Sequence, residues 1–255
     1  MKWGCIGVGT TVRFAASIAS TQLAYYLNQE VQMPETRRCT YTSDPIMVDG
    51  HLDEPGWAQA EVLEFFVPVS GEPVISRTDG RMLWDDNFLY AGFHACDRDV
   101  WSYQTERDCP TCHEDVLELF FMPDEASGVY YNFEINALGT VYDACNRPPY
   151  QAGGVSMLRW QQWDCQDLGV GIHVEGAIND LDVEDEFWQL EIAVPFASLP
   201  TVDGPPAPGD RWRFHLSRYD YSIYLPEGRE LSSTAHLSKC DFHYFQDWDV
   251  LEFQQ

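Results

Sequence analysis

Two cysteines and a histidine lie close together in the segment Cys109-Pro-Thr-Cys112-His113. This spacing matches the pattern that attaches a c-type haem through two thioether bonds and an axial histidine. The same dithiol could hold half of a zinc site or act in redox chemistry, and a distant histidine, His243, could complete a metal site. Covalent haem requires export, which the N-terminus supports poorly, so haem is less favoured than a metal or redox role. The favoured interpretation of the segment is a plain loop.

Paired carboxylates are a second source of chemistry, because two acids roughly 5–10 Å apart can cleave a glycosidic bond. Glu118 and Glu134 are the pair considered for that role. A chain with 41 acidic residues contains many such pairs by chance, so a weak hydrolase is an alternative and not the main interpretation. Glu134 and Asn136 are two positions apart on one expected strand, so their side chains share a face.

An acidic run at residues 179–186, Asn-Asp-Leu-Asp-Val-Glu-Asp-Glu, supplies oxygen atoms that could bind calcium. It lacks the glycine of an EF-hand loop at the required place, so we interpret the run as a solvated turn. No cofactor is therefore required by the sequence, and calcium is the one to test.

The elements that must position these residues are short strands. Runs of β-branched and aromatic residues, separated by Asp, Asn, Gly and Pro clusters, indicate an all-β protein from residue 46 onward. One short helix is expected at residues 53–60, capped by Asp53 and with Pro55 in its first turn. About eleven strands are expected, at residues 46–48, 62–67, 81–84, 88–95, 116–122, 130–135, 140–143, 168–174, 188–194, 211–218 and 250–253.

Alternation of apolar and polar residues is clear at 187–194 and 212–216, which predicts strands with one face in water. Many short strands without βαβ spacing favour two stacked antiparallel sheets. The predicted fold class is therefore all-β, an antiparallel, jelly-roll-like β-sandwich.

Composition limits the possible partners. The chain has 255 residues, 45% of them hydrophobic, which is enough for a packed core. A net charge of −26 repels phosphate backbones and anionic lipid headgroups, so we expect neither nucleic acid nor membrane as a partner. The only lysines are Lys2 and Lys239, and this acidic, lysine-poor surface also suits high salt, which makes a halophilic source a hypothesis.

The N-terminal region and the cysteines bear on the compartment. Residues 1–32 resemble a signal peptide only weakly, because polar residues interrupt the apolar stretch. We therefore expect residues 1–40 to be a disordered N-terminal extension or the result of a misassigned start. Eight scattered cysteines fit reduced, mostly buried thiols. The sequence does not decide the cellular compartment, although the cytoplasm is slightly favoured over export. The sequence has no run of about 18 apolar residues, so no transmembrane helix is expected.

Four ordered motifs carry a family resemblance, and a matching C-terminal part follows them. They are Ile46-Met-Val-Asp-Gly-His-Leu-Asp-Glu-Pro-Gly-Trp57, Leu83-Trp-Asp-Asp-Asn-Phe-Leu-Tyr90, Glu114-Asp-Val-Leu-Glu-Leu-Phe120 and Tyr131-Asn-Phe-Glu-Ile-Asn-Ala-Leu-Gly139. Over residues 41–255 the chain resembles the family 9 carbohydrate-binding modules and the free-standing bacterial proteins related to them. The resemblance implies a β-sandwich that binds mono- or oligosaccharides without hydrolysing them, in a family where calcium is known, and we expect a monomer.

The resemblance also implies a ligand site. Glu118, Glu134 and Asn136 fall where the family places polar sugar contacts. The family holds sugar between two tryptophans, because C–H-rich sugar faces stack on aromatic rings. Here those two positions are Cys112 and Phe242, and a cysteine cannot stack a sugar. Two further aromatic residues, Trp101 and Tyr244, could rebuild part of the platform.

Overall fold

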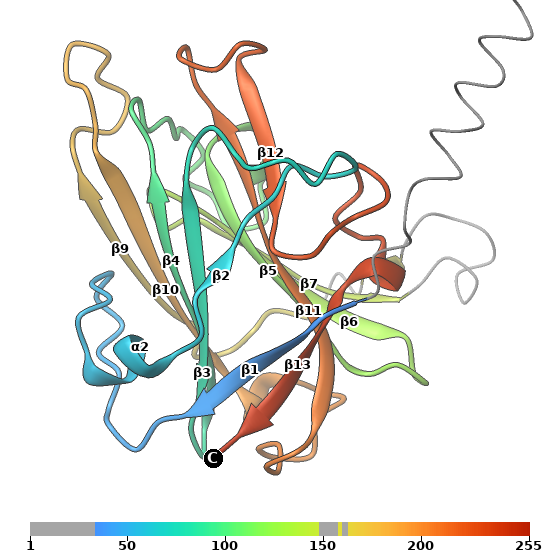
Figure 1. Cartoon of the computed structure of the whole chain (residues 1–255). Coiled ribbons are helices and arrows are strands. Elements are labelled where there is room, and N and C mark those ends of the chain that lie inside the picture. The colour runs from blue at the N-terminus through green and yellow to red at the C-terminus, as the bar shows by residue number, and fades with distance from the viewer. Residues whose placement is uncertain (1–33, 148–157, 160–162) are drawn as a thin grey trace, which may run out of the picture. The chain divides into compact units, whose positions relative to one another are not determined.

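Strands dominate the described part of the chain, which in this computed structural model comprises residues 34–147, 158–159 and 163–255 (Figure 1). The one α-helix in those ranges, α2 (Pro55–Gln59), is short, and no helix there is long and apolar enough to cross a membrane. The strands are β1 (Thr36–Tyr41), β2 (Leu63–Glu64), β3 (Thr78–Trp84), β4 (Phe88–Cys96), β5 (Val116–Asp124), β6 (Val129–Asn136), β7 (Val141–Arg147), β8 (Leu158–Arg159), β9 (Gly169–Glu175), β10 (Phe187–Pro195), β11 (Arg211–Tyr221), β12 (Arg229–Ser233) and β13 (Asp249–Gln254).

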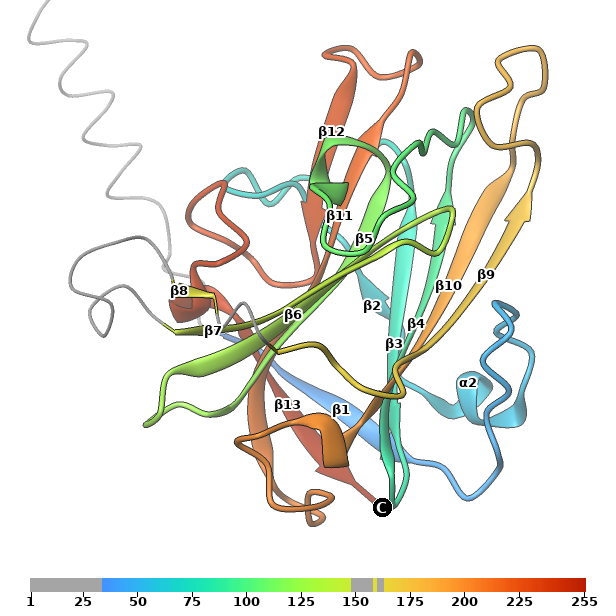
Figure 2. The same cartoon turned by 180° about the vertical axis from the view of Figure 1, so that it is seen from behind.

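The strands hydrogen-bond in the order β8-β7-β6-β5-β11-β13-β1-β3-β4-β10-β9, with β12 beside β11 and β2 beside β3 (Figures 1 and 2). β1 runs parallel to both of its neighbours, β13 and β3, whereas the other paired strands are antiparallel. β1 thus joins two antiparallel halves into one curled sheet. The expected β-sandwich is confirmed, with this parallel junction as the feature that alternation alone did not predict.

The main core lies between the two halves of the sheet. Successive strand residues point to opposite faces, so every second residue of a strand can enter this core. On β5 the core residues are Leu117, Leu119 and Phe121, and on β10 they include Leu190 and Ile192. Burying each such side chain contributes about 1.5–3 kcal/mol to stability. The other face of β5 consequently carries Glu118 and Phe120.

A second apolar cluster covers that outer face. Phe120 and Tyr130 contribute from the sheet, while Phe242 and Trp248 come from the segment that precedes β13. The Trp248 indole donates to the Phe242 carbonyl at 2.8 Å, which fixes this segment as a cap over the outer face of β5, β6 and β11. One predicted site residue, Phe242, is buried in this cluster.

Several expected elements differ in the structure. The sheet includes β1, which begins at Thr36, so it starts before the predicted domain boundary at residue 41. β1 and β12 were not predicted, because their mostly half-exposed, polar sequences show little alternation. Residues 46–48 form no strand. The cap residue of α2 is Glu54 and not Asp53, whereas Pro55 does begin the helix. The N-terminal extension was expected at residues 1–40, and residues 1–33 of it lie outside the described residues.

Candidate functional site

Glu118 and Glu134, predicted as a pair, lie directly opposite each other on β5 and β6. Glu118 is 2% exposed and accepts a hydrogen bond from the Ser217 hydroxyl at 2.7 Å. Glu134 is 8% exposed and accepts from the Thr111 hydroxyl at 2.9 Å and from the Asn132 amide at 3.0 Å. The structure therefore brings the pair together but buries both carboxylates among protein donors.

Burial sets the electrostatics of this pair. Loss of solvent, together with repulsion from Glu134, raises the pKa of Glu118 well above its ordinary value. The same burial and the two nearby carboxylates raise the pKa of the Cys112 thiol to about 11. The thiol is therefore neutral near pH 7, which argues against a reactive thiolate at this position.

Asn136 lies on the same face of β6 but is fully buried. Its amide nitrogen donates to a Glu114 carboxylate oxygen at 2.6 Å and to the Gln104 carbonyl at 2.8 Å. Its amide oxygen accepts from the backbone N–H groups of Thr140 at 2.8 Å and Leu138 at 3.1 Å. Since an amide offers two donors and two acceptor positions, none remains for a sugar, and Asn136 instead fixes the neighbouring loops.

The ring of Phe242 was expected to stack on sugar, and the structure contradicts this. Phe242 is 5% exposed and packs in the second apolar cluster, with ring centroids 5.3 Å from Tyr219 and 5.8 Å from His215. Its role is to hold the cap on the sheet. Tyr244, on the same cap, is half-buried, and the ammonium group of Lys239 lies 3.7 Å from its ring centre.

Trp101 is the predicted aromatic that solvent reaches, with 39% of its surface exposed. Its ring lies 5.4 Å from the Tyr103 ring and 6.1 Å from the Tyr221 ring, between ring centres. The three rings line a cavity of about 330 Å³, which we call the aromatic pocket. The remaining lining residues are Asp99, Val100, Asn179, Asp180, Leu181, Ser222, Ile223 and Gly228.

Hydrogen bonds hold the aromatic pocket in place. The Tyr221 hydroxyl donates to the Cys112 carbonyl at 3.0 Å, which links the pocket to the predicted site. On the other side, Asn179 both donates to and accepts from the backbone of Ser102, at 2.6 and 2.9 Å. The acidic run 179–186 thus forms one wall of the pocket, and no metal-binding group in the described residues is built from that run.

The dithiol segment offers no assembled metal site. Cys109 precedes a 3-10 turn (Thr111–His113) that contains Cys112 and on which His113 is exposed. Among the residues that the structure describes, the groups of three side chains that could hold a metal contain only aspartates. His243 lies in the second apolar cluster, where its Nδ1 atom is 2.9 Å from the Tyr130 hydroxyl. The cysteines within those ranges form no disulfides.

Solved structures show what this fold resembles. A Bacteroides uniformis protein, proposed to bind carbohydrate, superposes with a TM-score of 0.69 at 12% identity, covering 87% of this chain and 100% of its own. A family 9 carbohydrate-binding module from Caldicellulosiruptor kristjanssonii, in complex with cellotriose, gives a TM-score of 0.56 at 11% identity, covering 86% and 94%. Its glucose complex gives 0.55 at 12% identity, covering 86% and 96%.

The chain has the fold of the family 9 carbohydrate-binding modules. No protein-family profile and no curated protein sequence matches it, so the likeness is one of structure. Within this CBM9-like fold the expected aromatic clamp is absent, because Cys112 replaces one ring and Phe242 is buried.

Two residues of the aromatic pocket, Tyr103 and Tyr221, were missed by the sequence analysis. Tyr221 belongs to the alternating row Ser217, Tyr219, Tyr221 on the outer face of β11, which pairs with β12. The predicted strand ended at Arg218, so this row was cut short. Extending the alternation by three residues was the signal available in the sequence.

Proposed function

We propose that this protein binds carbohydrate without transforming it, and that the aromatic pocket is its binding site. The observation that carries the proposal is the convergence of three partly exposed rings, Trp101, Tyr103 and Tyr221, on one cavity. Support comes from the likeness to modules solved with glucose and cellotriose. Aromatic faces stack on the C–H-rich faces of sugars, while nearby polar groups pair with hydroxyls.

The chemistry of the pocket favours an uncharged sugar. Asp99 and Asp180 are the charged residues in its lining, and the whole chain carries a net charge of −26. Both features repel uronic acids and sulfated sugars. A volume of about 330 Å³ is at the small end for ligand pockets and suits a mono- or disaccharide unit.

Binding without hydrolysis fits the positions of the acids. Glu118 and Glu134 are buried, and their oxygen atoms accept hydrogen bonds from Ser217 of β11 and from Thr111 of the 3-10 turn. A glycosidase needs two carboxylates that reach one bond of the substrate. In this proposal Glu118 and Glu134 support the sheet, and Cys112 positions Tyr221 through its carbonyl.

Calorimetric titration of the full chain with neutral mono- and oligosaccharides tests the proposal. We expect a saturating heat with a Kd in the micromolar to millimolar range for the parent, and Trp101→Ala should weaken binding about tenfold by removing a stacking contact of about 1–1.5 kcal/mol. Tyr244→Ala is the control, because it removes an aromatic residue outside the pocket.

Glu118→Gln separates the two possible sites. This variant keeps the shape of a buried side chain that the proposal excludes from sugar contact, so its affinity should equal that of the parent. Lost binding in Glu118→Gln together with unchanged binding in Trp101→Ala would place the site at Glu118 and contradict the proposal.

A further inference from the structure

Three connections between strands meet at one end of the sheet and build most of the aromatic pocket. They are residues 97–115 between β4 and β5, residues 176–186 between β9 and β10, and residues 222–228 between β11 and β12, at the top of Figure 1. The first connection contributes the rings of Trp101 and Tyr103, the second contributes Leu181, and the third contributes Ile223. Side chains that are distant in sequence therefore share one cavity.

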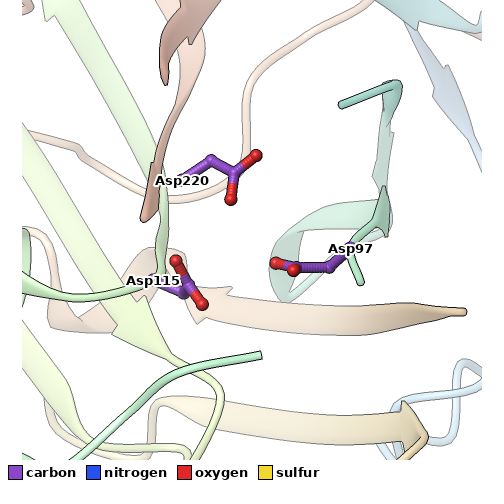
Figure 3. Close-up of side chains that lie close together, drawn as sticks. All are labelled: Asp97, Asp115 and Asp220. Atoms are coloured by element: carbon purple, nitrogen blue, oxygen red, sulfur yellow. The ribbon is translucent and has the colours of Figure 1, made fainter. Parts of the chain in front are cut away.

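A buried carboxylate holds two of the pocket rings from the inside. Asp115 accepts the backbone N–H of Trp101 at 2.6 Å and that of Tyr221 at 2.7 Å. It is fully buried, and Figure 3 shows its carboxylate on the side of Asp97 and Asp220, which are buried as well. Asp115 thus positions both rings, but a ligand in the pocket cannot reach its oxygen atoms.

The polar side chains of the pocket wall are largely occupied by the protein itself. Asp99 and Ser222 are each 7% exposed. The Ser222 hydroxyl donates to one carboxylate oxygen of Asp99, and the backbone N–H of Ile223 donates to the other at 2.9 Å. Both polar ends of the Asn179 amide bond to the backbone of the connection between β4 and β5. These three side chains therefore keep little hydrogen-bonding capacity for a ligand.

Few polar side chains remain for a sugar. Within the part of the chain that the structure describes, they are the Trp101 indole N–H, the Tyr103 hydroxyl and the exposed Asp180 carboxylate, which also accepts the backbone N–H of Asp182 at 3.0 Å. An indole N–H can only donate and a carboxylate can only accept, whereas a phenol can do both. This set can pair with a few hydroxyl groups of one sugar unit.

Apolar surface, in contrast, is abundant around the pocket. Leu181 is 67% exposed and Ile223 is 68% exposed, so both lie at its mouth. The Trp101 ring is inclined 79° to the Tyr103 ring and 59° to the Tyr221 ring, so one flat sugar face can stack on only one of them. A contiguous apolar patch of this kind marks a binding surface. A bare sugar, with hydroxyl groups around its ring, would leave the two aliphatic side chains in water.

We propose that the ligand of the aromatic pocket is a neutral sugar that carries an aryl group, an assignment that rests on the proposed function and names its ligand class. The sugar unit stacks on a pocket ring, and the aryl group covers Leu181 and Ile223. A cavity of about 330 Å³ is at the small end for ligand pockets, so it suits one ring beside the sugar and not a long acyl chain. The charge of Asp180 and the net charge of −26 disfavour an anionic substituent.

Calorimetry of the full chain with paired methyl and phenyl glycosides of glucose, galactose, mannose and xylose tests the assignment. For the sugar that binds, we expect the phenyl glycoside to have a Kd about tenfold below that of its methyl partner, because apolar surface is buried. Leu181→Asn combined with Ile223→Asn should reduce this ratio to about two by removing that surface. Met47→Asn is the matched control, since Met47 is also 67% exposed but lies outside the pocket, and it should keep the parent ratio. Thermal melting checks that each variant is folded.

The outcomes separate the assignment from the proposed function. Equal Kd values for the methyl and phenyl glycosides of a sugar that binds, or a ratio that the double variant leaves unchanged, overturn the aryl assignment and leave the proposed function standing. Phenol alone is titrated as well. Phenyl glycosides that bind no more tightly than phenol, without binding of any methyl glycoside, refute the proposed function and reassign the pocket to an aromatic ligand without sugar. Absence of binding by every compound refutes both.

Discussion

At the scale of single residues, burial determines which titratable groups stay neutral. His215 is fully buried between two partners, the Ser233 hydroxyl at 2.8 Å and the Phe242 carbonyl at 3.0 Å. Since a carbonyl can only accept, Nε2 carries the proton and Nδ1 accepts from Ser233. Loss of solvent lowers the pKa of His215 from 6.5 to about 3. This side chain therefore stays neutral over the range in which an unfolded histidine ionises.

The pH dependence of stability follows from this shift. Between pH 6.5 and about 3 the unfolded chain binds a proton at His215 and the folded chain does not, so acidification destabilises the fold. His215→Gln retains a donor for the Phe242 carbonyl but cannot ionise. We expect urea denaturation to show the parent losing stability relative to this variant by about 1.4 kcal/mol per pH unit below 6.5. A difference that does not change with pH would contradict the assignment.

At the scale of elements, one buried acid holds the irregular segment before α2. Glu191 of β10 is fully buried and accepts the backbone N–H groups of Asp49 and Gly50, both at 2.9 Å, and the Trp57 indole at 2.8 Å. Gly50 has φ +95°, and a Cβ there would lie 2.3 Å from the backbone of Ile172. The motif from residue 46 to residue 57 is thus held by side-chain acceptors and close packing, which explains why residues 46–48 do not pair as a strand.

Glu191→Ala should therefore release this segment. Two buried donors, the Gly50 N–H and the Trp57 indole, lose their acceptor, and we expect a loss of about 3 kcal/mol in the free energy of unfolding, measured with urea. Glu191→Gln keeps one acceptor atom and should lose less. The matched control is Glu186→Ala, an exposed acid next to β10, for which we expect a change within about 0.5 kcal/mol. Equal losses in Glu191→Ala and the control would refute the anchoring role.

Most of the strands were predictable and the pocket was not, for a physical reason. Alternation at residues 187–194 reports directly on which side of β10 is buried, because that pattern is local. The burial of Glu118 involves contacts distant in sequence, such as its hydrogen bond from Ser217, 99 positions away along the chain. Trp101 and Tyr221 lie near each other, and Asp115 binds the backbone of both. Contacts of this kind leave no periodic signal in a sequence.

At the scale of the whole molecule, the net charge of −26 opposes compactness through self-repulsion. Salt screens exposed charges, with a Debye length of about 10 Å at 0.1 M and about 3 Å at 1 M. We therefore expect the melting temperature to rise between 0.1 and 1 M KCl. Asp180→Asn combined with Asp182→Asn removes two exposed charges and should reduce that slope. A melting temperature that falls with KCl would show that ion pairs outweigh repulsion.

The parallel pairing of β1 with β13 has a consequence for how the molecule folds. It joins the two antiparallel halves at the middle of the sheet, and the nearby bond between Glu35 and Asp249 links positions 214 residues apart. Each half can form from contacts much closer in sequence, such as the hairpin of β3 and β4. Long-range contacts pay loop-closure entropy before they contribute stability, so joining the halves is the slow step in folding.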